Sequence, residues 1–218
     1  MKSGLLASLE EKKISRDTLF KRVAADFSLL PEVIEGLDSS KASVRYGCSK
    51  VLVSLSANFP EKLYPYVDVV IARLESDRRI LVWNALATTA NLATVDANKK
   101  IDANYEKIFS FINNEYLVTV ANLIDSSVKI AHAKPHLIHR ITTDLLRVEN
   151  LNTTPHLTEE CKLVLAEKAL KTFNALIDKM DATDKQKVID FAKRNKNSAR
   201  KRLNYEAEVF LKKWSNTQ

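Results

Sequence analysis

Residues 61–94 read EKLYPYVDVVIARLESDRRILVWNALATTANLAT. Between residues 61 and 75 the apolar side chains recur every three or four positions, which places them on one face of a helix. They are Leu63, Val67, Val70, Ile71 and Leu74, and Pro65 is tolerated in the first turn. A polar turn, Glu75-Ser76-Asp77, then precedes a second apolar stripe over residues 78–94. Its members are Leu81, Trp83, Ala85, Leu86, Ala90 and Leu92. The stretch therefore predicts two helices joined by a short capped turn.

The same arrangement occurs once before, at a shift of 37 positions. Five pairs of residues match across this shift: Leu37 with Leu74, Val44 with Leu81, Tyr46 with Trp83, Cys48 with Ala85, and Leu55 with Leu92. The turn matches as well, because Leu37-Asp38-Ser39-Ser40 also ends one apolar stripe and precedes the next. A period of this length is typical of repeat proteins built from stacked helical hairpins.

Residues 30–38, LPEVIEGLD, followed by Ser43-Val44-Arg45, resemble the HEAT-repeat family, whose repeats carry a Leu-rich first helix, an Asp in the turn and Val-Arg early in the second helix. The second repeat keeps Asp77 but has Val82 in the Arg position. A third copy is expected at residues 117–125 and 128–131, with Lys129 in that position. The resemblance covers about residues 28–148. It implies an all-α fold, an α-α superhelix of antiparallel helix pairs of the HEAT/armadillo-like solenoid kind.

One domain is expected over residues 1–218. Residues 1–27 are expected to form N-terminal cap helices, residues 28–148 the HEAT-like repeats, and residues 158–214 a set of C-terminal helices that carries a basic segment. An irregular connection is expected at residues 149–157, where Asn, Thr and Pro cluster. Within the C-terminal part, separate helices are expected from Thr158, over residues 185–193, and from Ser198.

Composition agrees with a helical protein and indicates where it resides. With three Gly and five Pro in 218 residues, the chain has too few turn residues for an all-β fold. Its apolar stretches are shorter than the roughly 20 residues that a membrane span requires, so no membrane partner is expected. Residues 1–6 lack the apolar core of a signal peptide, and Cys48 and Cys161 fit reduced thiols in helical stripes. A cytoplasmic location follows as the expectation.

The net charge of +7 is concentrated near the C-terminus. Residues 184–213 hold ten Lys or Arg against four Asp or Glu, a local +6 that leaves +1 for the other 188 residues. With Asn197 or Ser198 as N-cap, three cations occupy the first turn of the last helix, where the helix dipole favours an anion. The candidate anion- or nucleic-acid-binding residues are Lys193, Arg194, Lys196, Arg200, Lys201 and Arg202. The alternatives are an acidic protein partner and a solvated turn without function.

Three histidines, His132, His136 and His139, fall at helical spacing and are candidate metal ligands. Pro135 lies between the first two and disturbs the helix that would align them. Ordinary boundary histidines are the alternative, so neither a metal nor a cofactor is expected. The residues Asp38, Arg45, Asp77, Asp125 and Lys129 recur at equivalent places, which favours turn caps and ion pairs between repeats over acid–base catalysis. Tyr46 and Trp83 are interpreted as packing between helices, with a platform for base stacking as the alternative.

No Gly-rich phosphate loop, Cys-x-x-Cys, His-Glu-x-x-His or Gly-x-Ser-x-Gly motif occurs in the sequence. The resemblance therefore implies a non-enzymatic scaffold or adaptor that binds a protein or peptide on a concave surface. The alternative is a nucleic-acid-binding protein with the architecture of the HEAT-like DNA alkylation-repair glycosylases, although here the positive charge gathers at one end. A third hypothesis is an enzyme whose site joins the three histidines to Asp144 or Glu149.

Overall fold

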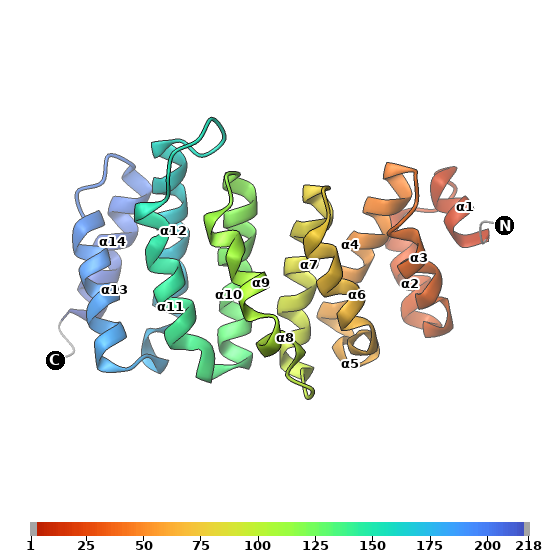
Figure 1. Cartoon of the computed structure of the whole chain (residues 1–218), viewed down its shortest axis with the longest axis horizontal. Helices are drawn as coiled ribbons and strands as arrows, with labels where there is room; N and C mark the ends of the chain where they lie inside the picture. The colour runs from red at the N-terminus through yellow and green to blue at the C-terminus, as the bar shows by residue number, and fades with distance from the viewer. Residues whose placement is uncertain (1–3, 216–218) are drawn as a thin grey trace. The chain divides into compact units, whose positions relative to one another are not determined.

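The structure, a computed structural model, describes residues 4–215 and is built from helices over that range, with one isolated β-bridge between Thr154 and Leu157. The chain divides into two compact units, one up to Asn104 and one from Tyr105 onward. Figure 1 shows the labelled helices of both. Short 3-10 turns connect or extend the helices, at Phe27–Leu29, Tyr64–Tyr66, Arg73–Glu75, Ala93–Val95, Ser110–Asn113, Pro135–Leu137, Arg147–Asn150 and Ile177–Lys179. No described helix combines the length and apolar character that crossing a bilayer requires.

The first unit places its longer helices side by side and covers them with shorter ones. Its helices are α1 (Gly4–Glu10), α2 (Arg16–Ala25), α3 (Leu30–Gly36), α4 (Ala42–Asn58), α5 (Pro60–Leu63), α6 (Val67–Ala72), α7 (Arg79–Leu92) and α8 (Lys100–Ala103). Helix α4 packs against α2 on one side and α7 on the other, while α3 packs on α4 and α6 on α7. We call α2, α4 and α7 the second-helix layer of this unit.

The second unit has the same two-layer arrangement. Its helices are α9 (Tyr105–Phe109), α10 (Leu117–Ala133), α11 (Ile138–Leu146), α12 (Glu159–Leu176), α13 (Ala182–Asn195) and α14 (Lys201–Trp214). Here α10, α12 and α14 form the second-helix layer, since α12 packs against both α10 and α14, and α11 and α13 pack against each other. The edge-to-face contact of Phe173 with Phe191, whose ring centroids lie 5.4 Å apart, joins the two layers.

The residues that match across the 37-residue shift lie in the core, as the stripes predict. Leu37, Val44, Cys48, Leu55, Leu74, Leu81, Ala85 and Leu92 are all buried. Tyr46 and Trp83 remain half-buried, so part of each ring faces solvent. Where α3 meets α4 the helices approach so closely that a Cβ on Gly36 would lie 2.4 Å from Cys48 Sγ. These observations confirm the predicted helical hairpins of residues 30–58 and 61–94.

The same turn chemistry precedes four helices of the second-helix layers. A side-chain oxygen accepts a hydrogen bond from the backbone N–H two residues later: Ser39 from Lys41 at 3.2 Å, Ser76 from Arg78 at 3.1 Å, Asn114 from Tyr116 at 3.1 Å and Ser198 from Arg200 at 3.2 Å. The residue that donates is in each case the N-cap of the following helix. Ser39 and Ser76 are 37 residues apart, so the turns support the same period as the core.

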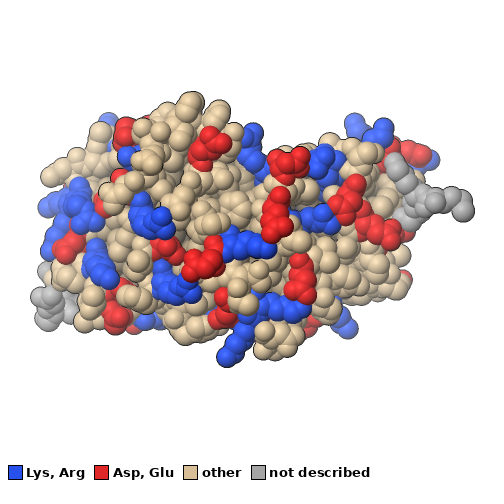
Figure 2. All heavy atoms as spheres, in the orientation of Figure 1, with Lys and Arg blue, Asp and Glu red and all other residues tan. Residues whose placement is uncertain are grey.

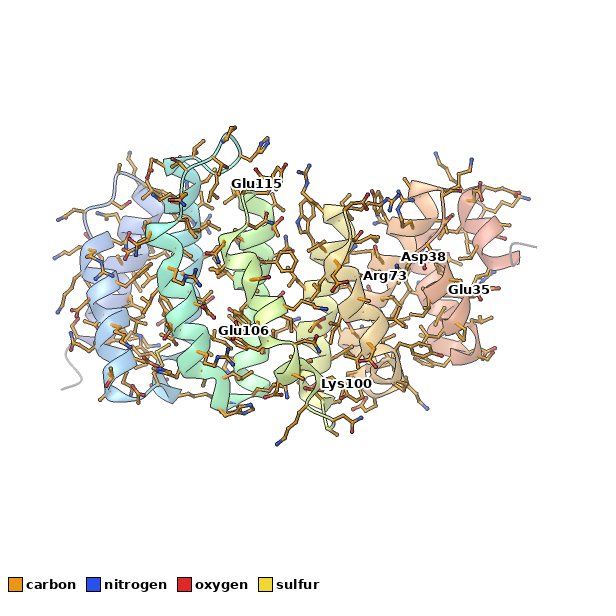
Figure 3. The ribbon with its side chains drawn as sticks, viewed as in Figure 1. Glu35, Asp38, Arg73, Lys100, Glu106 and Glu115 are labelled. Carbon is orange, nitrogen blue, oxygen red and sulfur yellow. The ribbon has the colours of Figure 1, made fainter. Side chains whose placement is uncertain are left out.

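The residues expected to act as caps or inter-repeat ion pairs take different roles. Asp38 accepts two hydrogen bonds from Arg73 of the next hairpin, and Asp125 on α10 pairs with Lys168 on α12 at 2.7 Å. Figure 3 labels Asp38 and Arg73, which point toward each other. Asp77 pairs only with its neighbour Arg78, and Arg45 donates to the carbonyl of Ser39 at 2.6 Å. The ion-pair interpretation is confirmed for Asp38 and Asp125, while no aspartate of this group provides a cap.

Three helix boundaries were predicted wrongly. Residues 117–125 and 128–131 form one helix, α10, because Ser127 donates its hydroxyl to the Ile124 carbonyl and the chain does not turn. Residues 128–145, interpreted as one helix that Pro135 disturbs, are two helices. Helix α10 ends at Ala133, and Lys134 leaves the helical region at φ −130° and ψ 74°, because the α conformation is disfavoured before a proline. The last helix begins at Lys201 with Arg200 as N-cap, in place of Asn197 or Ser198. The helix predicted over residues 61–75 keeps its bounds but is interrupted by the 3-10 turn Tyr64–Tyr66, which contains Pro65, and so forms α5 and α6. Helices α7, α12 and α13 fall close to their predicted ranges.

Candidate functional site

The basic segment of residues 193–202 lies at the end of α13 and the start of α14, where acidic side chains already meet most of its charge. Arg194 donates two hydrogen bonds to Glu149, at 2.7 and 3.1 Å, and Asn195 donates a third at 2.8 Å. Lys193 pairs with Asp190 one turn earlier on α13. The three hydrogen bonds to Glu149 attach α13 to the 3-10 turn after α11. Arg194 and Lys193, two of the predicted anion-binding residues, therefore already have acidic partners.

Glu167 is the centre of a second acidic group that holds the start of α14. This carboxylate on α12 is buried, with 5% of the residue exposed. It accepts hydrogen bonds from Lys171 at 2.7 Å and Arg200 at 3.0 Å and pairs with Arg202 at 2.9 Å, while Arg200 also reaches Glu160 at 2.7 Å. Burial alone would raise the pKa of Glu167, but these hydrogen bonds, with the charges of Lys171 and Arg202, hold it below its usual value.

Four of the six predicted anion-binding residues therefore have acidic partners. The ion pairs of Arg194, Arg200 and Arg202 join α12 and the 3-10 turn after α11 to the C-terminal hairpin. Lys196 and Lys201 have no ion pair within residues 4–215. The sequence placed the six cations together correctly, because they are neighbours in the chain. The partners of Arg194, Arg200 and Arg202 come from 33 to 45 residues earlier, so local charge counting could not find them.

The three histidines are separated by the helix break at Pro135. His132 lies in the last turn of α10, with its Nδ1 2.9 Å from Lys179 Nζ. His136 lies in the 3-10 turn, and His139 on α11 lies 2.9 Å from Asp184. Within the described part of the chain, the group with metal-ligand atoms inside 4.8 Å of one another is His139, Asp181 and Asp184. The histidines do not converge as predicted.

That acidic group has an ordinary structural explanation. Asp181 is the N-cap of α13 and accepts from the Asp184 N–H at 2.8 Å, and the Asp184 carboxylate also faces Lys187 Nζ at 3.4 Å. A nearby ammonium opposes a cation at the same place. Asp144 and Glu149 serve other partners, since Asp144 accepts from Tyr105 at 2.8 Å and Glu149 from Arg194. The hypothesis of a catalytic cleft that joins them to the histidines gains no support.

The second-helix layer of the first unit has a solvent-facing side of different character. Helices α4 and α7 contain no Asp or Glu at all. Five pairs of positions at the 37-residue spacing are exposed or half-buried: Ser43 with Ile80, Tyr46 with Trp83, Lys50 with Ala87, Ser54 with Asn91, and Ala57 with Thr94. We call this set the α4/α7 face. It offers aromatic, apolar and amide groups without negative charge.

The other surfaces of the molecule are more evenly charged. Each of the corresponding helices of the second unit carries at least one acidic residue, among them Asp125, Glu160 and Glu206. Figure 2 shows acidic and basic side chains interspersed over the visible side of the first unit. The α4/α7 face therefore differs from both in lacking negative charge of its own.

A ladder of amide–hydroxyl hydrogen bonds fixes α4 and α7 beneath this face. Asn84 donates its amide to the Ser49 hydroxyl at 2.8 Å, and Asn91 donates to the Ser56 hydroxyl at 2.9 Å. The two steps lie seven residues apart on each helix, or two helical turns. The Oδ1 atom of half-buried Asn84 has no partner within residues 4–215 and can accept from a ligand. The sequence analysis did not single out these four residues. A usable signal was present, because Ser49 and Ser56 have the same seven-residue spacing as Asn84 and Asn91.

Comparison with known proteins identifies the fold class. No protein-family model matches the sequence, and no curated protein does either. Among solved structures, the designed armadillo repeat protein YIII(Dq)4CqI matches over 95% of this chain and 89% of its own, at 14% identity and a TM-score of 0.63. The designed armadillo repeat protein YIII(Dq.V1)4CPAF, described in complex with peptide (KR)4, matches over 96% and 91%, at 12% identity and a TM-score of 0.65. The chain thus has an all-helical, armadillo-like repeat fold, as predicted.

Proposed function

We propose that this protein is a non-enzymatic scaffold that binds an extended peptide segment of a partner protein across the α4/α7 face. The observation that carries the proposal is the matched exposure of Tyr46 and Trp83, one on each helix at equivalent positions. Aromatic side chains held on rigid helices provide large contact areas at a low entropy cost, and they dominate many binding interfaces. The peptide named with one of the similar designed proteins adds support for this class of ligand.

The spacing of the layer suits a peptide that crosses the helices. Packed helices lie about 8–10 Å apart, and an extended chain advances about 3.3 Å per residue. Each helix therefore meets about every third residue of the ligand. The Asn84 carbonyl oxygen, free within the described residues, is available for a backbone N–H of that ligand. The Asn–Ser ladder keeps the two aromatic side chains at a fixed separation.

The nucleic-acid alternative has less support. A protein that relies on phosphate neutralisation commonly makes about 6–10 phosphate contacts. Four of the cations in the basic C-terminal segment already contact Asp190, Glu149, Glu160 or Glu167. Duplex DNA and single-stranded RNA therefore serve as competing ligands in the test below.

The test is selection of displayed random peptides of roughly 12 residues, an extended length of about 40 Å, on the full chain. We expect enriched peptides whose affinity falls about tenfold in Tyr46→Ala or Trp83→Ala. Tyr205→Ala is the matched control, because Tyr205 is 63% exposed on α14 of the second unit. Failure to enrich peptides, or affinities that Tyr205→Ala lowers as much as Trp83→Ala, contradicts the proposal. So does tighter binding of the oligonucleotides through the same residues.

A further inference from the structure

A pocket of about 590 Å³ opens between the α1–α2 loop, the start of α2 and the start of α4. Its lining consists of Leu9, Lys12, Ile14, Ser15, Arg16, Ala42, Ser43, Tyr46 and Gly47. Tyr46 and Ser43 also belong to the α4/α7 face, so the pocket is continuous with that face. A ligand lying across the face can therefore place one side chain in the pocket.

Two cations line the pocket without an acidic partner. Lys12 and Arg16 form no ion pair with any residue of the range 4–215. The acidic residues nearest in sequence are engaged elsewhere: Glu10 with Lys41 at 3.6 Å, Glu11 with Lys13 at 2.6 Å, and Asp17 with Lys21 at 2.8 Å. Glu10, Glu11 and Asp17 therefore do not neutralise the positive charges of Lys12 and Arg16.

The remaining walls complement an anionic group. Ser15 and Ser43 contribute hydroxyls, and Tyr46 contributes a ring that already carries the Arg45 guanidinium 4.9 Å from its centroid. Lys41, the N-cap of α4, makes no side-chain capping hydrogen bond to the first N–H groups of that helix. Hydroxyls and backbone N–H groups beside two cations are the donor set that binds carboxylate and phosphoryl oxygens.

The charges on the helices around the pocket also favour an anionic ligand. The helices α2, α4 and α7 contain a single acidic residue, Asp17, which pairs with Lys21. Lys50 adds a further exposed cation on the α4/α7 face that has no ion-pair partner in the described part of the chain. An acidic ligand therefore meets no like charge on α4 or α7, and the one carboxylate of α2 is already paired.

We infer that the pocket binds an anionic side chain, carboxylate or phosphoryl, and that the partner segment of this protein is acidic. The inference rests on the proposed function, because it assigns the charge of the same ligand. Lys12 and Arg16 contact the anionic group, Ser43 donates to it, and Tyr46 joins the pocket to the aromatic part of the interface. The rest of the peptide continues over α4 toward Trp83 on α7.

The experiment compares selections from the same random peptide library on the full chain and on its Lys12→Gln/Arg16→Gln variant. We expect peptides enriched on the unaltered chain to carry an Asp or Glu at one conserved position near an end. Replacing that residue with Asn or Gln is expected to weaken binding about fivefold to tenfold on the unaltered chain and to change little on the variant. Lys62→Gln, at an exposed cation on α5 near the opposite end of α4, is the matched control.

Replacing the acidic residue at the conserved position with phosphoserine distinguishes the two anionic groups. Tighter binding of the phosphoserine peptide assigns the pocket to a phosphoryl group, and weaker binding assigns it to a carboxylate. Peptides that depend on Trp83 but show no acidic preference overturn the pocket inference and leave the proposed function standing. Peptides whose affinity ignores Trp83 and Tyr46 overturn the proposed function itself. An unchanged circular dichroism spectrum and midpoint of thermal unfolding verify that the double variant is folded.

Discussion

Arg73 and Asp38, 35 residues apart, form a bidentate ion pair with N–H···O distances of 2.6 and 2.8 Å. The pair connects the turn after α3 to the end of the next hairpin's first helix. We expect Arg73→Lys to lower the free energy of unfolding by about 1 kcal/mol, because lysine cannot donate two parallel hydrogen bonds. Urea denaturation measures this. Arg78→Lys is the control, since Arg78 pairs only with its exposed neighbour Asp77, and an equal loss there contradicts the assigned role.

Removal of the buried carboxylate at Glu167 is expected to destabilise the second unit. Glu167→Gln leaves Lys171, Arg200 and Arg202 without their shared partner, and we expect a loss of about 2 kcal/mol at pH 7. The exposed Glu160 provides a milder comparison, because Glu160→Gln removes only one contact to Arg200.

The effect of Glu167→Gln depends on pH in a direction that the lowered pKa determines. Because the pKa of this carboxyl is lower in the folded than in the unfolded chain, its stabilisation is complete above the unfolded value and is lost as the pH falls through the folded one. The difference in stability between the unaltered chain and the variant should therefore shrink below about pH 4.5. A difference that grows on acidification contradicts this assignment.

Gly36 is expected to tolerate no larger residue while Cys48 is present. A Cβ at position 36 would lie 2.4 Å from Cys48 Sγ, so Gly36→Ala should destabilise the chain by about 1–3 kcal/mol. The double variant with Cys48→Ala should recover most of that loss. Gly47→Ala is the control, because the nearest atom to its Cβ would be the flexible end of Leu9 at 3.1 Å, with Arg16 Cγ at an ordinary 3.7 Å. Absence of rescue by Cys48→Ala contradicts the proposed clash.

The two thiols are expected to react at very different rates. Burial, followed by the charge of Glu32, raises the pKa of Cys48 to about 12, so almost no thiolate exists at pH 8. Cys161 is partly exposed near the start of α12. A chromogenic disulfide reagent at pH 8 should modify one thiol quickly and the other only after denaturation. Rapid modification of both thiols, or of a Cys161→Ser variant, contradicts the burial of Cys48.

Local sequence patterns predicted the hairpins but not the contacts that hold them together. The stripes around Leu74 and Leu81 and the serine turn at Ser76 are short-range signals, and the structure confirms them. The break predicted between residues 125 and 128 was wrong, because the buried Ser127 satisfies its hydroxyl inside the helix by donating to the Ile124 carbonyl.

The candidate sites depend on contacts between residues that are far apart in the sequence. The basic segment looked available because Glu149 and Glu167 are distant in sequence and close in space. The pocket at Lys12 and Arg16 arises only when α4 folds against the α1–α2 loop, about 30 residues earlier in the chain. Neither relationship has a signature within one helix.

The most direct measurement follows the fluorescence of Trp83 while a selected peptide is added. The sequence has two tryptophans, and Trp214→Phe leaves Trp83 as the single emitter at the loss of one hydrogen bond to Asn174. A peptide bound on the α4/α7 face should desolvate the indole ring and shift its emission to shorter wavelength, with the same saturation curve as peptide anisotropy. Saturable anisotropy with an unchanged Trp83 emission would place the peptide elsewhere and contradict binding at this face.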